Sequence, residues 1–349
     1  IKPSARDALA ALRGDGLRDL VAKQNPELLK HIVMLICPDL NADGNDRISK
    51  LNRTYQNGPA NGVGERQNSQ WLDLNRDAMK LESPEMRGVV ANVLTRWDPA
   101  IVMDCHTTNG SYHQEPVTFT WMMNPNGDRE LIRYMRDRMM PWVSQTLKGK
   151  YGTLNCFYGE FINLRSYEEG WISYASEPRY FSNYVGIRNR LGILNENYVY
   201  AGYKERVLGC YNLIASVADY ALDYHEEIMQ LLARADSNSL NLGTQAASSD
   251  SFAVKYSGIP TPNMITILTY QAEAYTDERG RERFRKTDTK RTVTVPYIAD
   301  YIPAESVAYP YGYILPVQNQ DVLQLLRQHG VEFKMLTDNV TLTVEQFAI

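Results

Sequence analysis

The stretch AIVMDCHT, residues 100–107, ends an apolar run with an acid, a cysteine and a histidine. A short continuous apolar run is typical of a strand buried on both faces of a sheet. We therefore predict a buried strand whose last residues include Asp104 and His106. Active sites of α/β proteins gather beyond the ends of strands, so His106 is the first candidate for a functional residue.

Similar runs lie on both sides of this stretch. Further strands are predicted for HIVMLICP (31–38), VTFTWMM (117–123) and LGILNENYVY (191–200), the last of which carries Glu196. Helices are predicted between them, over about 7–21, 83–97, 128–147 and 204–234. Residues 41–72 show little periodicity and are predicted to form a long surface loop. Strands that alternate with helices favour an α/β layered fold.

The pattern changes towards the end of the chain. Residues 237–250 are small and polar, which is typical of a linker. Beyond them, SFAVKY, MITILTYQAEAY, RTVTVPY, YILP and VTLTVEQF alternate like strands, with one short helix near 318–329. We therefore predict a first domain over 1–236 and a smaller β-rich domain over 251–349, in which the mixed-charge run 277–291 is a solvated hairpin.

The composition is that of an ordinary globular protein. The chain has 349 residues, 44% of them hydrophobic, and a net charge of −4 from 37 basic and 41 acidic residues. This balance favours no nucleic-acid partner. No apolar run approaches the roughly 18 residues that cross a membrane. The four cysteines are far apart and are predicted to be free thiols. The oligomeric state is left open.

Five short motifs follow one another in a fixed order. They are Asn41-Ala42-Asp43-Gly44, Leu51-Asn52-Arg53, Asp73-Leu74-Asn75-Arg76-Asp77, Asp104-Cys105-His106 and Leu194-Asn195-Glu196. Each motif alone is weak, but their order resembles that of the zinc carboxypeptidases, the M14 metallopeptidase family. The resemblance covers residues 1 to about 234. It implies a three-layer sandwich with a mixed central sheet.

The resemblance also implies a site. His106 would be a zinc ligand, Glu196 the general base and Arg53 the cation that polarises the scissile carbonyl. Asn75 and Arg76 would bind the free C-terminal carboxylate of a peptide substrate. The location implied is secreted or periplasmic.

The chemistry of these side chains suits the roles. Catalytic zinc has three protein ligands and keeps a position for water, and a nearby glutamate can take the water's proton and deliver it to the leaving amine. A guanidinium stabilises an oxyanion and pairs bidentately with a carboxylate. Asp104 lies two residues before His106, on the same side of a strand, and can orient its ring.

Structural interpretations remain open for each residue. Arg53 can anchor a loop, Asn75 and Arg76 can form a loop cap and a surface ion pair, and Glu196 can pair with Arg188 or Arg190. His106 can be a histidine that is satisfied within the core.

The sequence departs from the family at the other two zinc ligands. The family supplies them from an HxxE motif, and the single histidine before His106 is His31, in His31-Ile32-Val33-Met34. We expect the motif to lie upstream of Ile1. The segment His329-Gly330-Val331-Glu332 matches the HxxE pattern. It follows His106 in the chain and lies at a predicted helix end, so it is not expected to bind metal. His113 and His225 are interpreted as loop and surface residues.

The substrate pocket is less well defined. Tyr174 matches the family's mobile active-site tyrosine, with Tyr167, Tyr180 and Tyr184 as competitors. Arg179 or Arg188 is a candidate for binding a negatively charged substrate. Three function classes follow: a zinc exopeptidase that removes a C-terminal residue, an amidase acting on cell-wall peptides or another amide, and a non-catalytic peptide-binding protein.

Overall fold

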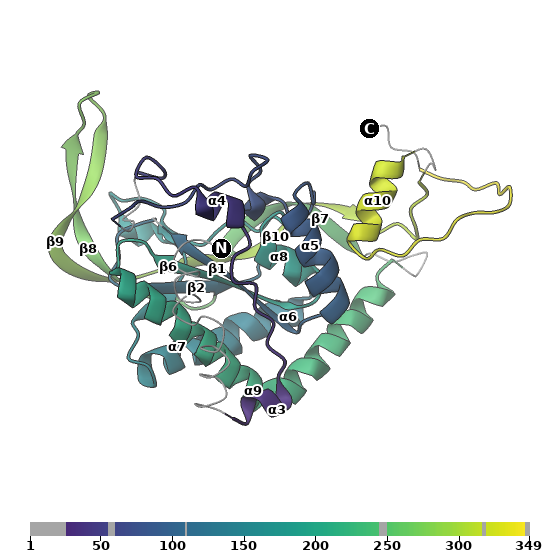
Figure 1. The fold of residues 1–349 in the computed structure, drawn as a ribbon, viewed down its shortest axis with the longest axis horizontal. Coiled ribbons are helices and arrows are strands. Elements are labelled where there is room, and N and C mark those ends of the chain that lie inside the picture. Colours follow the sequence, from purple (N-terminus) through teal and green to yellow (C-terminus); the bar gives the residue numbers. More distant parts are fainter. Residues whose placement is uncertain (1–25, 55–59, 109, 244–249, 316–318, 346–349) are drawn as a thin grey trace.

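The computed structural model describes residues 26–54, 60–108, 110–243, 250–315 and 319–345 (Figure 1). Its central sheet has the order β1-β6-β2-β3. The strands are β1 (Ile101–Thr108), β6 (Leu191–Tyr198), β2 (Val117–Trp121) and β3 (Asn155–Phe157). Strand β6 runs parallel to β1 and antiparallel to β2, and β2 runs parallel to β3. The fold is therefore α/β with a mixed sheet.

Helices connect these strands where the sequence predicts them. Ser83 caps α5 (Pro84–Val89) through a hydrogen bond from Met86 N, and Pro84 occupies the first turn. The helix continues as η2 (Val90–Thr95), and the next helical segment comprises α6 (Arg129–Tyr134), η3 (Met135–Met139) and α7 (Met140–Gly149). Further helices are α8 (Phe181–Ile187) and α9 (Tyr203–Asn241). The shorter ones are α3 (Leu28–His31), α4 (Ala42–Asp46), η1 (Leu74–Arg76) and η4 (Tyr167–Glu169).

The two faces of the central sheet are covered by different helices. On β6, Gly192 packs against the backbone of Ser182 in α8, whereas Asn195 donates a hydrogen bond to Cys210 in α9. Side chains alternate along a strand, so Glu196 shares the α8 face with Gly192. In Figure 1, α9 runs below the sheet. The helix α9 is long, yet no helix in the described ranges is long and apolar enough to cross a membrane.

The C-terminal strands join the rest of the molecule. A second sheet has the order β4-β5-β10-β7, in which β5 (Trp171–Ile172) pairs with β10 (Tyr297–Ala308). The other strands are β4 (Glu160–Phe161) and β7 (Ser251–Pro260). Ile267 and Tyr297 belong to the same apolar core as Trp121. The predicted regions 1–236 and 251–349 thus share a sheet and a core, and α9 continues into the predicted linker at 237–250.

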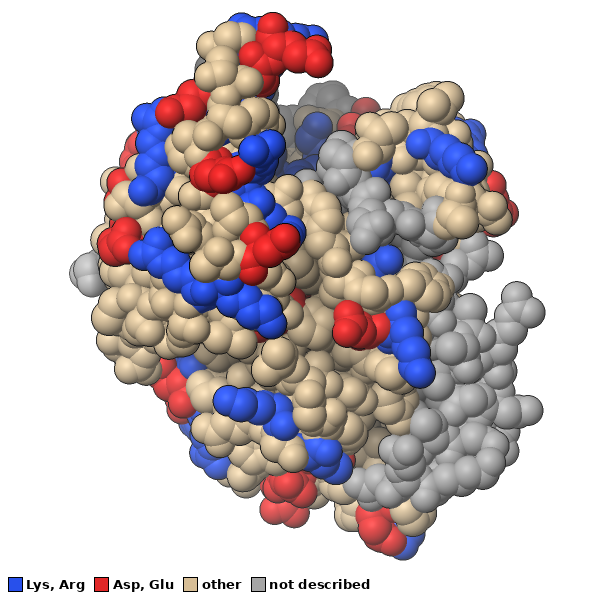
Figure 2. Space-filling model, turned by 90° about the vertical axis from the view of Figure 1, so that its left-hand side faces the viewer, with Lys and Arg blue, Asp and Glu red and all other residues tan. Residues whose placement is uncertain are grey.

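The remaining strands form a long hairpin, β8 (Ile265–Thr276) with β9 (Glu282–Val295). Its tip extends away from the body of the molecule (Figure 1), and basic and acidic side chains alternate over this face (Figure 2). Near the tip, Asp277 pairs with Arg281 and Arg283, each at 3.2 Å. The prediction of a solvated mixed-charge hairpin is confirmed.

Three predicted elements differ from the structure. The run 31–38 is not a strand: after α3 it is irregular, because no described segment pairs with it. The two predicted strands after β10 are also wrong over their described residues, 313–315 and 340–345, which form no ladder. The helix α10 (Gln320–Gln328) lies where a helix was expected. The helix predicted over 7–21 lies outside the described residues.

Gly192 lets α8 approach the sheet closely. A Cβ at this position would lie 2.3 Å from the carbonyl oxygen of Ser182, a backbone atom that cannot move aside alone. We expect Gly192→Ala to lower the free energy of unfolding by about 1–3 kcal/mol. Gly88→Ala is the control, because nothing lies within 4 Å of that site in α5, and it should raise stability by up to about 1 kcal/mol. Urea unfolding measures both, and equal effects would contradict the packing of α8.

Candidate active site

His106 lies near the end of β1 with its ring held by Asp104. The Nε2 atom of His106 is 2.7 Å from a carboxylate oxygen of Asp104, and the histidine is 9% exposed. Asp104 thus orients the ring of His106, as its place on the same strand face allows. The other ring nitrogen, Nδ1, is buried and has no hydrogen-bond partner. An oriented imidazole with one free nitrogen has the form of a metal ligand.

Glu196 lies beside His106 on the neighbouring strand. The parallel register pairs His106 with Glu196, and the antiparallel register pairs Glu196 with Thr118. The Thr118 hydroxyl donates to the Glu196 carbonyl oxygen over 2.6 Å, which fixes the strand at this point. The two residues are far apart in sequence, and the sheet brings them together as adjacent strand-end side chains.

Asn75 and Arg76 lie on η1, in a tightly held loop. Asp73 accepts a hydrogen bond from Asn75 N over 3.1 Å and forms an ion pair with Arg66. Arg76 donates to the Asn75 carbonyl over 2.6 Å, and its guanidinium lies 4.5 Å from the centre of the Tyr180 ring. In the described part of the chain Arg76 forms no ion pair, so most of its N–H donors remain for a ligand.

These residues border two adjoining cavities. The smaller, about 300 Å³, is lined by Asn75, Arg76, Tyr174 and Glu196. The larger, about 820 Å³, is lined by Arg53, Asn75 and His106. Asn75, Asp104 and Phe181 line both. The residues named by the motifs therefore line two cavities that adjoin at these three residues, and we call the two cavities together the hollow.

Arg53 faces the larger cavity from the loop before η1. Its backbone has a φ of 49°, an uncommon left-handed conformation for a residue other than glycine. Its Nε atom is buried without a hydrogen-bond partner. No carboxylate in the described ranges pairs with Arg53, whose cationic side chain lines a cavity.

The tyrosine at the site has a fixed position. The hydroxyl of Tyr174 bonds to Ser182 at 2.7 Å and to the backbone carbonyl of Trp121 at 3.2 Å. Burial raises the pKa of Tyr174 far above its ordinary value. Its ring lines the smaller cavity while its hydroxyl is held in the core. Tyr180, one of the competing tyrosines, is the one that contacts Arg76.

Whether the site can hold zinc depends on His106 and on the other possible ligands around it. Nδ1 of His106 suits a metal, but the described residues place no group of three ligands around it. One such group does exist among them, formed by His113, Glu115 and Cys156, with ligand atoms within 4.8 Å of one another. The structure thus provides one suitable zinc ligand at the hollow, and no reaction step is derived from the metal itself.

The His113 group joins the hairpin to the central sheet. His113 stacks on Tyr198 at 3.8 Å, and Glu115 accepts a hydrogen bond from Leu268 N of β8 over 2.8 Å. His113 lies in the connection between β1 and β2, as expected for a loop residue, but it is only 3% exposed and therefore not a surface residue. Through these contacts the buried side chains of His113 and Glu115 attach the hairpin to the central sheet.

The other candidates have structural partners. The ring nitrogens of His329 are bonded to the Tyr184 hydroxyl at 2.7 Å and the Met79 carbonyl at 2.9 Å, so this histidine attaches α10 to the core. Arg190 pairs with Asp98 and Asp236, and Arg188 binds the His329 carbonyl. His225 contacts the Leu222 carbonyl at 2.9 Å on α9. Arg179 lies over Tyr180, 5.1 Å from the ring centre.

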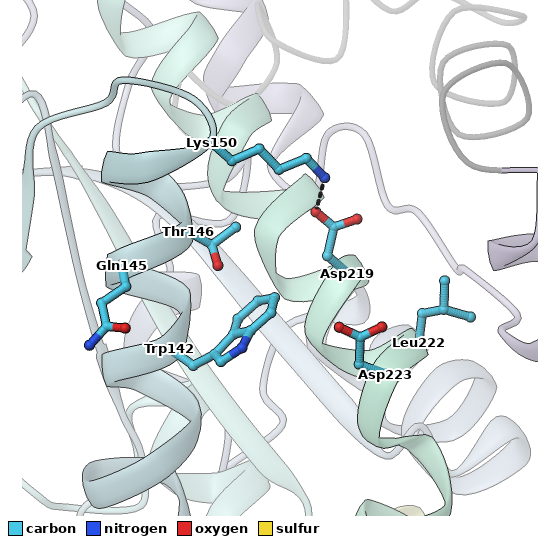
Figure 3. A pocket seen from close by; sticks show the side chains of 7 residues that line it. All are labelled: Trp142, Gln145, Thr146, Lys150, Asp219, Leu222 and Asp223. Atoms are coloured by element: carbon cyan, nitrogen blue, oxygen red, sulfur yellow. Dashed lines mark hydrogen bonds and ion pairs between the residues drawn. The ribbon is translucent and has the colours of Figure 1, made fainter.

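A separate hollow of about 490 Å³ lies between α7 and α9. Figure 3 shows Lys150 and Asp219 joined across its mouth, 2.5 Å apart, with Trp142 forming the wall. The hydrogen bond with Asp219 raises the pKa of Lys150 and keeps it charged. This separate hollow contains none of the residues that the motifs name.

Sequence reasoning missed two acidic groups of the smaller cavity, Tyr158 and Glu160. Burial raises the pKa of Glu160, and the nearby Glu196 carboxylate raises it further. Burial also raises the pKa of Tyr158, with contributions from both carboxylates. Tyr158 directly follows β3 and Glu160 begins β4, and neither residue belongs to a motif, so only the fold brings them to the site.

Comparisons with known proteins identify no family for this chain. No protein-family model, no curated protein and no solved structure matches it. Its function is therefore inferred from the ordered motifs and from the hollow that they line.

Proposed function

We propose that the protein is a zinc-dependent exopeptidase that hydrolyses the C-terminal peptide bond of peptides. The proposal includes the finer fold, a three-layer sandwich like that of the zinc carboxypeptidases. The observation that carries it is the pairing of His106 and Glu196 on adjacent strands, beside a cavity that contains Arg76. Arg53 lines the larger cavity with His106, and Arg76 lines the smaller cavity with Glu196.

Each residue has a step in this reaction. Arg76 binds the substrate's terminal carboxylate bidentately and Asn75 adds a hydrogen bond, which place the last peptide bond near Glu196. Glu196 takes a proton from the attacking water, whose oxygen forms a bond to the carbonyl carbon. Arg53 stabilises the negative charge that develops on the carbonyl oxygen. Glu196 then gives the proton to the leaving nitrogen as the C–N bond breaks, which releases one amino acid.

Zinc would be held by His106 Nδ1, with Asp104 fixing the ring. When bound, zinc supplies a Lewis acid and lowers the pKa of water to about 7. An amidase and a peptide-binding protein would use the same hollow. Arg76 and Asn75 favour an exopeptidase over these two alternatives, because a guanidinium and an amide that bind a carboxylate are most useful where the substrate ends in one.

Zinc content tests the role of His106. We expect the full-length protein to contain about one zinc per chain, and His106→Ala to lose most of it, because one of three ligands is removed. Asp104→Asn should weaken zinc binding by about 10- to 100-fold. His329→Gln is the control, because both ring nitrogens of His329 are already bonded and this histidine lines neither cavity. Metal analysis by mass spectrometry decides: zinc that survives His106→Ala but not Cys156→Ser would place the metal in the His113 group instead.

A further inference from the structure

The His113 group lies where three chain segments meet. His113 and Glu115 belong to the connection between β1 and β2, and Cys156 lies on β3, beside β2. All three residues are buried, with 3%, 2% and 6% of their surface exposed. Their ligand atoms, a nitrogen, a carboxylate oxygen and a sulfur, lie within 4.8 Å of one another. Each of these atom types binds zinc and similar transition metals in proteins.

The imidazole of His113 has a fixed orientation, but one of its nitrogens has no hydrogen bond. The ring stacks on Tyr198, with 3.8 Å between the ring centres, and meets Trp171 edge-on at 6.1 Å. Its Nδ1 atom is buried without a hydrogen-bond partner. A buried polar atom without a partner destabilises the folded state, and native proteins seldom retain one unless an ion or a ligand binds it.

The spacing of the ligand atoms fits a shared metal better than a hydrogen bond. Glu115 Oε2 lies 3.5 Å from His113 Nδ1. An N–H···O hydrogen bond spans about 2.7–3.2 Å, whereas two atoms that bind one zinc tetrahedrally at about 2.1 Å lie about 3.4 Å apart. The Cys156 sulfur lies within 4.8 Å of both atoms, so a small rotation of its side chain would bring it to a metal.

The charges of the group suit a divalent cation. A carboxylate on Glu115 and a thiolate on Cys156 would together balance two positive charges, which lets the ion lie in the core as a neutral unit. Among the described residues, His113 is the one ion-pair partner of Glu115. The other contacts of this carboxylate are hydrogen bonds from Leu268 N at 2.8 Å and Gln114 N at 3.2 Å, which leave lone pairs for a metal.

We propose that the His113 group is a metal site separate from the hollow, which binds zinc or a similar divalent transition metal through His113 Nδ1, Glu115 Oε2 and Cys156 Sγ. None of the three residues lines either cavity of the hollow, so the role of this metal is structural. Because Glu115 also accepts the hydrogen bond from Leu268 of β8, the ion would tie the hairpin to the central sheet. This inference does not depend on the proposed exopeptidase function.

Cobalt(II) is the probe, because a thiolate bound to cobalt gives a near-ultraviolet charge-transfer band that nitrogen and oxygen ligands do not give. Added to the full-length zinc-containing protein, cobalt should bind at about one further equivalent per chain and produce this band. Cys156→Ser should abolish the band, and His113→Gln should weaken cobalt binding at least about 10-fold. Cys210→Ser, at a buried free cysteine on α9, is the matched control. The band should survive His106→Ala, which separates the two sites.

X-ray absorption identifies the metal's neighbours in the unmodified protein, so the test holds even if a variant fails to fold. One sulfur at about 2.3 Å from cobalt, or from zinc already present, would support the site. Cobalt with nitrogen and oxygen neighbours alone, or a band that survives Cys156→Ser, would overturn it. So would the absence of further cobalt binding in a protein whose zinc has no sulfur ligand. Peptide cleavage is measured separately, and its failure would leave this site intact.

Discussion

Replacing Glu196 by glutamine is expected to lower kcat for release of a C-terminal residue by about 10³-fold. Glutamine keeps the size and the hydrogen-bonding shape of the side chain, but it cannot take a proton from water. In the proposed mechanism Arg76 and Asn75 bind the peptide, so the dissociation constant should change little. Stopped assays of amino-acid release measure kcat, and calorimetry measures binding.

Glu226→Gln is the matched control for this change, since Glu226 is an exposed carboxylate on α9. It should leave kcat unchanged. A Glu196→Gln protein that releases amino acids at the original rate would show that another group moves the proton. A protein that loses binding and activity together would instead indicate a structural role for Glu196 on β6.

Replacing Arg76 by lysine is expected to lower kcat/KM about 100-fold for peptides with a free C-terminal carboxylate. Lysine keeps the positive charge but not the planar fork that binds a carboxylate through two parallel hydrogen bonds. It also loses part of the contact with the Tyr180 ring, which holds the guanidinium in place. The effect should be mainly on KM.

The exposed Arg96 provides the matched control, and Arg96→Lys should have no effect. The dependence on the substrate is the sharper readout. If Arg76→Lys impaired free and amidated peptides equally, Arg76 would not bind the terminal carboxylate. An amidase whose substrates continue past the scissile bond would give that result.

The sequence predicts the local elements of the site better than their neighbours in space. Periodicity and capping predict β1, β6 and α5, because hydrophobic patterns and Ser83-Pro84 act over short distances. The alternation of a single strand predicts that Asp104 and His106 lie on one face, and the structure shows the bond between them. These features depend on residues that lie within a few positions of one another.

What the sequence could not predict depends on long-range pairing. The apolar pattern of 31–38 does not indicate whether another strand will pair with this segment, and no described strand pairs with it. The link of β5 to β10 joins residues far apart in the chain. Glu160 reaches the cavity, and His113 the core, for the same reason. A hydrophobic pattern indicates that a segment tends to form a strand, but which strand pairs with it depends on the whole fold.

The most direct test of the central claim is the mass of a peptide after incubation with the full-length protein. Two forms of one peptide are compared, with a free and with an amidated C-terminus. We predict that the free form loses the mass of its last residue, in a reaction that a zinc chelator stops, and that the amidated form stays intact. Cleavage at an internal bond, or equal cleavage of both forms, would contradict the exopeptidase assignment.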